Sequence, residues 1–188
     1  DVSALAKLKQ LTYLGLVENK KIDLNTVAKL TKLKTLILGG SRLREVSALA
    51  KLTQLESLYL GSNRLTDASP LAKLTQLESL HLNGNQLTDV DALVGLEKLK
   101  TLILSGNQLA DVSALAKLKQ LKYLHLGGNK KIDPNTLAEL RQLTTLGLDS
   151  SRLTDVSALT GLKQLQGLYL GSNQLADLSP LAALTQLM

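Results

Sequence analysis

The chain has 188 residues, of which 44% are hydrophobic, 20% are charged and only 2% are aromatic. This length predicts one or at most two domains, and the shortage of aromatic residues predicts a core of aliphatic side chains. The absence of cysteine excludes a disulfide framework, and no apolar stretch reaches the roughly 18 residues that span a bilayer. The formal net charge of +6 makes nucleic-acid binding a function to test against the positions of the basic residues.

Leucine recurs every 22 residues through the chain, without insertions. The leucines in this phase are Leu11, Leu33, Leu55, Leu77, Leu99, Leu121, Leu143, Leu165 and Leu187. A partial unit over residues 1–10 precedes eight complete units over residues 11–186, and residues 187–188 begin a further unit. A fixed period of this length is typical of solenoids, in which each unit stacks on its neighbours. We therefore predict one solenoid domain over residues 1–188.

Each unit begins with a short predicted strand, continues into a turn and ends in a return segment. The unit at residues 55–76 reads LESLYLGSNRLTDASPLAKLTQ. Its Leu58 and Leu60 alternate with residues other than leucine, as expected for a strand with one buried face. Glycine, serine and asparagine then mark a turn. Leucines spaced three apart follow and predict a short 3₁₀ or helical turn capped by Asp67 or Ser69. We expect an α/β fold, a curved solenoid with a concave parallel sheet and convex helical return segments.

A polar residue occupies the same place after each predicted strand. It is asparagine or serine, at Asn19, Ser41, Asn63, Asn85, Asn107, Asn129, Ser151 and Asn173. A recurring buried polar side chain needs hydrogen-bond partners, so we predict a ladder from these side chains to the backbone of neighbouring turns. The two serines can form fewer hydrogen bonds than asparagine and predict weaker rungs.

A second repeat has a period of 110 residues, or five units. Its clearest matches are NKKID at 19–23 and 129–133 and SRL at 41–43 and 151–153. In the two NKKID segments the apolar residue, Ile22 or Ile132, stands one place later than the leucine of other units, and lysine takes the earlier place. We expect a local bend of the return segment there.

These units resemble the 22-residue class of leucine-rich repeats found in bacterial internalins and in eukaryotic regulators of protein phosphatase 1. The resemblance covers essentially the whole chain. It implies protein binding through the concave strand face, and it favours a bacterial cell-surface or secreted location. Internalins also carry a helical cap and an immunoglobulin-like domain, which residues 1–188 lack. Because the chain starts and stops within units, we expect a fragment or an engineered array, whose ends are free to associate end to end.

Two columns of residues are expected to face the concave surface, because they alternate with the strand leucines. The central column consists of Gly15, Ile37, Tyr59, His81, Ile103, His125, Gly147 and Tyr169. The adjacent column consists of Tyr13, Thr35, Ser57, Ser79, Thr101, Tyr123, Thr145 and Gly167. All four tyrosines and both histidines lie in these columns, and tyrosine is enriched at protein interfaces. The predicted partner-binding residues are Ile37, Tyr59, His81, Ile103, Tyr123, His125 and Tyr169. The alternative is that strands accept tyrosine and isoleucine without any binding role.

Catalysis, metal binding and nucleic-acid binding are not expected. The sequence has no cysteine, no HExxH and no phosphate-binding glycine loop. His81 and His125 should stand about 10 Å apart across two strands, with Ile103 between them and no carboxylate to complete a zinc site, so neither a metal nor another cofactor is predicted. Most lysines fall in the return segments without an arginine cluster or an aromatic stacking platform.

The predicted function is therefore non-catalytic binding of a protein partner through the concave strand face. Two alternatives remain. One is a structural or engineered repeat array that acts as a self-assembling scaffold. The other is a recognition segment within a larger signalling protein.

Overall fold

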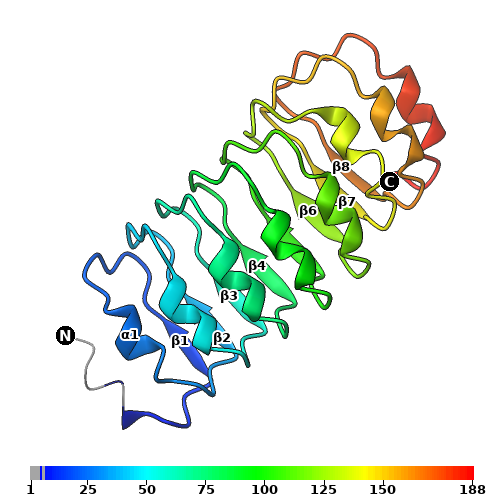
Figure 1. Ribbon diagram of the computed structural model, residues 1–188. Coiled ribbons are helices and arrows are strands. Elements are labelled where there is room, and N and C mark those ends of the chain that lie inside the picture. Colours follow the sequence, from blue (N-terminus) through cyan, green and yellow to red (C-terminus); the bar gives the residue numbers. More distant parts are fainter. Residues whose placement is uncertain (1–4, 6) are drawn as a thin grey trace.

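The computed structural model describes residue 5 and residues 7–188, and in this part of the chain eight strands form one parallel sheet in sequence order. The strands are β1 (Tyr13–Gly15), β2 (Thr35–Ile37), β3 (Ser57–Tyr59), β4 (Ser79–His81), β5 (Thr101–Ile103), β6 (Tyr123–His125), β7 (Thr145–Gly147) and β8 (Gly167–Tyr169). Each strand pairs with the next at an offset of 22 residues, so Leu58 lies opposite Leu80. The coils stack into an elongated solenoid with the two termini at opposite ends (Figure 1).

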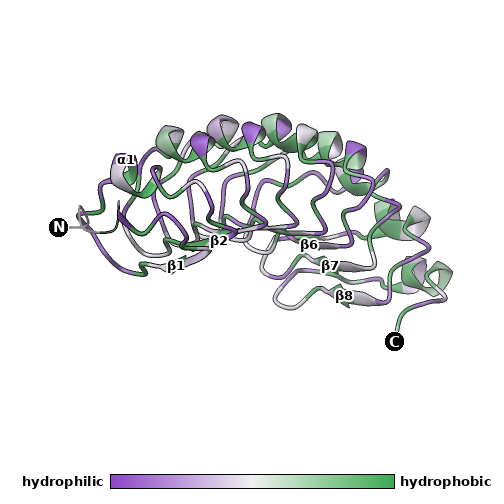
Figure 2. Cartoon of the chain, turned by 90° about the horizontal axis from the view of Figure 1, so that it is seen from below, coloured by the Kyte–Doolittle hydropathy of each residue, from purple (hydrophilic) through white to green (hydrophobic). Residues whose placement is uncertain are grey.

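One short helical turn lies in each return segment. These are α1 (Leu24–Val27), η2 (Ser47–Lys51), η3 (Ser69–Lys73), η4 (Asp91–Gly95), η5 (Ser113–Lys117), η6 (Pro134–Leu137), η7 (Ser157–Gly161) and η8 (Ser179–Ala183), where η denotes a 3₁₀ helix. They line the convex side of an arch whose inner side is the sheet (Figure 2). Over the described residues, no helix has the length and apolar character to cross a membrane. The predicted architecture is thus confirmed, with the 3₁₀ form in all return segments but one.

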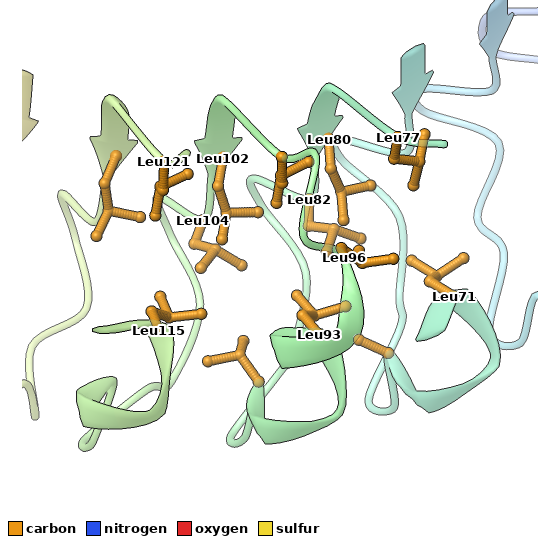
Figure 3. Close-up of a cluster of buried hydrophobic side chains, with 14 of the residues drawn as sticks. Leu71, Leu77, Leu80, Leu82, Leu93, Leu96, Leu102, Leu104, Leu115 and Leu121 are labelled. Carbon is orange, nitrogen blue, oxygen red and sulfur yellow. The ribbon is translucent and has the colours of Figure 1, made fainter. Parts of the chain in front are cut away.

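The core fills the space between sheet and helical turns and is almost entirely leucine. Leu80 and Leu82 of one coil and Leu102 and Leu104 of the next are fully buried, and they point toward the leucines of the helical turns (Figure 3). Each buried leucine contributes roughly 1.5–3 kcal/mol from the removal of apolar surface from water. Because no coil covers its own leucines alone, the stacking of neighbours stabilises every coil.

The asparagine ladder forms as predicted through the middle of the stack. In Asn85, Oδ1 accepts a hydrogen bond from the backbone N–H of Leu65 in the preceding coil at 3.0 Å, and Nδ2 donates to the carbonyls of Leu60 and Leu82 at 3.0 and 2.9 Å. Asn63, Asn107, Asn129 and Asn173 repeat the pattern. Asn19 is exposed, and among residues 5 and 7–188 its side chain bonds to the Val17 carbonyl alone, so it is not a rung.

Both serine rungs are weaker, in agreement with the expectation. The Ser41 hydroxyl has carbonyl acceptors at 3.3 and 3.4 Å, on Leu16 and Gly39. The Ser151 hydroxyl donates to the Asp149 carbonyl at 3.3 Å. Neither hydroxyl accepts from a backbone N–H of the preceding coil, as the asparagine Oδ1 atoms do. The ladder is therefore interrupted at two places.

The return segments of the two NKKID coils follow a different path, as their sequence suggests. Asp23 and Asp133 are extended N-caps, and their carboxylates accept from the backbone N–H groups of Asn25 and Asn135 at 2.9 Å. The helical turns α1 and η6 start one residue earlier in the unit than the others. The apolar residue shifted by one place, Ile22 or Ile132, lies beside this altered entry.

In the regular coils the N-cap of the helical turn is not the residue predicted from the sequence. We expected Asp67 or Ser69 to cap its helical turn, but Ala68 is the N-cap of η3 and makes no side-chain hydrogen bond. The Asp67 carboxylate, one place earlier, accepts from the Ser69 backbone N–H and hydroxyl at 2.7 and 2.8 Å. Aspartate thus stabilises the turn before the helix, and these hydrogen bonds lower the pKa of Asp67.

Candidate partner-binding surface

The central column is continuous across the sheet. Register pairs link its members from strand to strand, with Tyr59 opposite His81 and Ile103 opposite His125. Ile37 and Tyr169 lie in the same column toward the two ends. The leucines between these positions are buried, whereas the column residues from β2 to β6 are partly exposed. The sequence register therefore placed six of the seven predicted residues in one row.

The seventh predicted residue, Tyr123, lies in the adjacent column. It is on β6, two residues before His125 and on the same face of the sheet. The row of side chains in the central column is interrupted after His125, because the next position, on β7, is Gly147. Tyr169 follows on β8 and is 52% exposed. The predicted residues on β2 to β6 thus form a continuous group, and Tyr169 is separated from it by Gly147.

Tyr59 and His81 form an aromatic pair on this surface. Their ring centroids are 4.4 Å apart and the ring planes are tilted by 45°. Burial lowers the pKa of the His81 imidazole below its usual value of 6.5, because desolvation disfavours the charged form. Near neutral pH, His81 is therefore an uncharged, partly apolar surface that continues the face of Tyr59.

A hollow of about 260 Å³ lies beside this pair, at the edge of the sheet where the strands end. Tyr59 and His81 line it together with Glu18, Gly61 and Asn83. A Cβ atom at Gly61 would lie 2.7 Å from Oδ1 of Asn83, so glycine at that place allows the amide to pack against the backbone. The hollow thus combines an aromatic wall, a backbone floor, an amide and a carboxylate.

His125 is held in a different way, on the other side of Ile103. Its Nδ1 accepts from the Gly127 backbone N–H at 3.3 Å, and its Nε2 lies 3.4 Å from Oδ2 of Asp149. The other oxygen of Asp149 accepts from the Gly171 N–H at 3.0 Å. The ring occupies the space above Gly147, where a Cβ atom would lie 2.3 Å from its Cδ2. His125 is therefore oriented toward β7, away from His81.

The two histidines consequently belong to separate groups. Tyr59 contacts one, Asp149 contacts the other, and Ile103 lies between them. Within the described residues, no three or more histidine, cysteine, aspartate or glutamate side chains come together in a way that could hold a metal ion.

Paired charges border the start of the strands. Lys34 and Glu56 form an ion pair at 2.8 Å, and Glu78 and Lys100 form another at the same distance. In each pair the glutamate offsets a lysine that flanks a strand. Exposed pairs of this kind contribute little to stability, and their effect is to leave this border of the surface close to neutral.

Three residues of this surface were not predicted as site residues. They are Glu18 and Asn83, which line the hollow beside Tyr59 and His81, and Asp149, which contacts His125. Asn83 and Asp149 occupy the second position after the central column, in the coils of His81 and Gly147. A search of that position for polar residues among its glycines would have found both.

A family model that describes two copies of a leucine-rich repeat matches the chain at residues 31–73, 53–95, 97–140 and 141–183. The chain belongs to the leucine-rich repeat family. Leucine-rich repeat proteins are typically modules for protein interaction rather than enzymes. A comparison with curated protein sequences gave no significant match.

Solved leucine-rich repeat structures from bacteria are similar to this chain. The internalin InlF of Listeria monocytogenes is 32% identical with a TM-score of 0.78, and the match covers 100% of this chain and 63% of InlF. Internalin C2 of the same species is 34% identical with a TM-score of 0.63, over 85% of this chain and 80% of that one. The leucine-rich repeat protein LIC12759 of Leptospira interrogans is 28% identical with a TM-score of 0.84, over 99% and 50%. The fold is thus internalin-like, and the chain spans less than two thirds of InlF and half of LIC12759.

Proposed function

We propose that this leucine-rich repeat chain is a non-catalytic module that binds a protein partner through its concave strand surface. The contact residues are Ile37, Tyr59, His81, Ile103, Tyr123, His125 and Tyr169. The observation that carries the proposal is the placement of all four tyrosines and both histidines of the protein on one face of one sheet. Aromatic residues are the side chains that most often anchor protein interfaces.

The rigidity of the surface supports the same function. The column residues from Ile37 to His125 stand on strands whose backbones are bonded to both neighbours, and asparagine side chains fix most of the turns behind them. A preformed surface loses little conformational entropy on binding, so a few anchors can provide useful affinity. The Tyr59–His81 pair and the Asp149-oriented His125 are such preordered anchors.

Affinity capture with a matched pair of variants tests the proposal. Wild-type protein, a Tyr59→Ala/Tyr123→Ala double variant and a Lys73→Ala/Lys117→Ala control on the convex side are immobilised side by side. Partners identified from the wild type are purified, and their affinities for all three proteins are measured by calorimetry. We expect the tyrosine variant to lose about 30-fold or more in affinity, the effect of about 2 kcal/mol at a hot spot, and the control to bind like wild type. Equal affinity of the tyrosine variant and the wild type would contradict the proposal.

The proposed histidine contacts also predict a pH dependence of binding. A partner that covers His81 removes it further from water, so protonation of the ring opposes binding. Because the pKa of His81 in the free protein already lies below 6.5, affinity should be constant above about pH 7 and fall as pH decreases below about 6.5. A constant affinity between about pH 7 and pH 5 would exclude a direct contact of His81 with the partner.

A self-assembling repeat array is distinguished from a binding module by its mass in solution. Sedimentation velocity over a hundredfold range of concentration measures it directly. A binding module keeps a constant sedimentation coefficient, whereas end-to-end association increases the coefficient with concentration.

A further inference from the structure

Two equivalent hollows lie outside the concave sheet, one in each copy of the five-unit repeat. Each hollow lies on the turn side of the solenoid, where an NKKID coil meets the following SRL coil. The first junction hollow has a volume of about 580 Å³ and is lined by residues that include Lys20, Ile22, Arg42, Leu43 and Ala48. The second has a volume of about 340 Å³ and is lined by residues that include Lys130, Ile132, Arg152, Leu153 and Ala158. These five residues of the second hollow lie 110 residues after those of the first.

The asparagine ladder is interrupted at the coils that form these two hollows. In a regular coil, the asparagine Oδ1 accepts from a backbone N–H 20 residues earlier, as Asn85 does from Leu65. Ser41 and Ser151 stand at the asparagine position, and their hydroxyls bond only to carbonyl oxygens. The absent hydrogen bond to the preceding coil and the shifted isoleucine of the NKKID coil therefore occur together at both hollows.

Both hollows carry an excess of positive charge. Four basic and two acidic side chains line the first, and three basic and one acidic side chain line the second, a formal excess of two positive charges in each. The basic residues are Lys20, Arg42, Arg44 and Lys51 in the first hollow and Lys130, Lys131 and Arg152 in the second. None of these seven forms an ion pair within residues 5 and 7–188. Their charged groups are thus available to an external anion.

The carboxylates at the hollows accept hydrogen bonds from residues close to them in the sequence. The Asp23 carboxylate accepts from the Asn25 N–H at 2.9 Å and from the Thr26 hydroxyl at 2.7 Å. Asp155 accepts from the Ser157 N–H at 3.1 Å and from its hydroxyl. Glu45 accepts from the Ser47 hydroxyl in the same way. These carboxylates stabilise turns and do not neutralise the neighbouring guanidinium groups by direct contact.

We propose that the two junction hollows bind two acidic motifs of one extended polypeptide, each motif pairing a carboxylate with a neighbouring apolar side chain. The carboxylate suits the arginine, since guanidinium and carboxylate match in bidentate geometry. The apolar side chain suits the floor of each hollow, formed by Ile22 and Leu43 in the first and by Ile132 and Leu153 in the second. This surface is distinct from the concave column and does not depend on its function.

The spacing of the hollows favours a partner that engages both. Five strands at about 4.8 Å place equivalent points roughly 24 Å apart along the sheet, the length of about seven residues of extended chain at 3.4 Å each. Binding at one hollow then makes binding at the other an intramolecular step. The four tyrosines all lie on the concave face, so the turn side offers no aromatic platform for unpaired nucleic-acid bases.

Designed peptides test the proposal with the intact chain. The two-motif probe carries two Glu-Leu-Glu segments joined by about 18 Gly/Ser residues, whose root-mean-square length matches about 24 Å. The one-motif probe replaces one segment with Gln-Leu-Gln. Fluorescence anisotropy at about 50 mM salt, where surface electrostatics is little screened, gives the affinity of each probe. The proteins are wild type, Lys20→Gln/Arg42→Gln, Lys130→Gln/Arg152→Gln and the convex control Lys73→Gln/Lys117→Gln.

We expect wild type and the convex control to bind the two-motif probe at least about tenfold more tightly than the one-motif probe. Either hollow variant should lose this gain, while its circular dichroism and thermal unfolding match wild type because the four replaced side chains are exposed. The proposal is overturned if wild type shows no gain, or if the convex control loses the gain as fully as the hollow variants. Tighter, hollow-dependent binding of an oligonucleotide or a sulfated oligosaccharide of equal charge would overturn the assignment of a polypeptide.

Discussion

Tyr59 and His81 stand on adjacent parallel strands with their ring centroids 4.4 Å apart. The contact joins two neighbouring coils on the concave side of the sheet, on the face opposite the leucine core. Its consequences for stability and titration can be measured without knowing the partner.

The first prediction is an energetic coupling between these two rings. A double-mutant cycle with Tyr59→Ala and His81→Ala should give a coupling of about 0.5–1 kcal/mol in the free energy of unfolding, as for other aromatic cross-strand pairs. Urea unfolding of the four proteins measures it. The matched cycle of Tyr59→Ala with His125→Ala, whose side chains are three strands apart, should be additive within about 0.5 kcal/mol. Equal coupling in both cycles would show that the ring contact has no specific energy.

The second prediction concerns the titration of His81. Burial lowers its pKa in the folded protein below 6.5, so NMR titration of the imidazole protons should give a midpoint below that of the urea-unfolded chain, which should lie near 6.5. The unfolded chain then takes up its proton at higher pH than the folded protein. The contribution of His81 to stability is therefore complete above about pH 7, falls as pH decreases through 6.5 and levels off below the folded pKa. His81→Gln should remove this component, and a folded midpoint at or above 6.5 would contradict the burial effect.

The third prediction concerns the asparagine ladder. Asn85→Ala removes the acceptor for the Leu65 N–H and both donors to carbonyls, and Asn85 is only 6% exposed. Buried groups left without partners cost about 1–3 kcal/mol each, so the loss for three backbone groups should lower the free energy of unfolding by about 3 kcal/mol or more. Gln86→Ala, at the exposed next residue, should change it by less than about 0.5 kcal/mol. Similar small losses in both variants would show that the ladder is not an important source of stability.

The fourth prediction tests the orientation of His125. A Cβ atom at Gly147 would lie 2.3 Å from the ring, whereas a Cβ atom at Gly95 would meet nothing within 4 Å. Gly147→Ala should therefore displace the ring from Asp149 and change the NMR shifts of both its carbon-bound protons. Gly95→Ala should leave them unchanged. Unaltered His125 signals in the Gly147→Ala variant would mean that the ring does not lie over β7.

The strands and their register could be predicted strand by strand from the sequence. A period of 22 residues without insertions fixes which residues are neighbours, so Leu58 opposite Leu80 follows from counting. The leucine core and the central column follow from the same count, because alternation on a strand decides which side chains are buried. The ladder was predictable for a similar reason, except at Asn19, whose hydrogen bonding is confined to its own turn.

The features that could not be predicted depend on contacts between coils and on side-chain orientation. The pairing of His125 with Asp149 requires the ring to turn over Gly147, which no periodicity specifies. The arginines were a missed signal, since the sequence suggested no arginine cluster. Arg42 and Arg64 share one position in successive units, and Arg44 and Arg64 line a common hollow of about 460 Å³ on the turn side.

Photo-crosslinking from the concave column tests the central claim most directly. A photoreactive amino acid replaces Ile103, between the two histidine groups, and in a matched protein it replaces Lys117 on the convex side. Each protein is irradiated with the purified partner, and the crosslinked peptides are identified by mass spectrometry. Partner binding through the concave surface predicts a strong crosslink from position 103, lost in the Tyr59→Ala/Tyr123→Ala background, and none from position 117. A crosslink from position 117 with none from position 103 would contradict it.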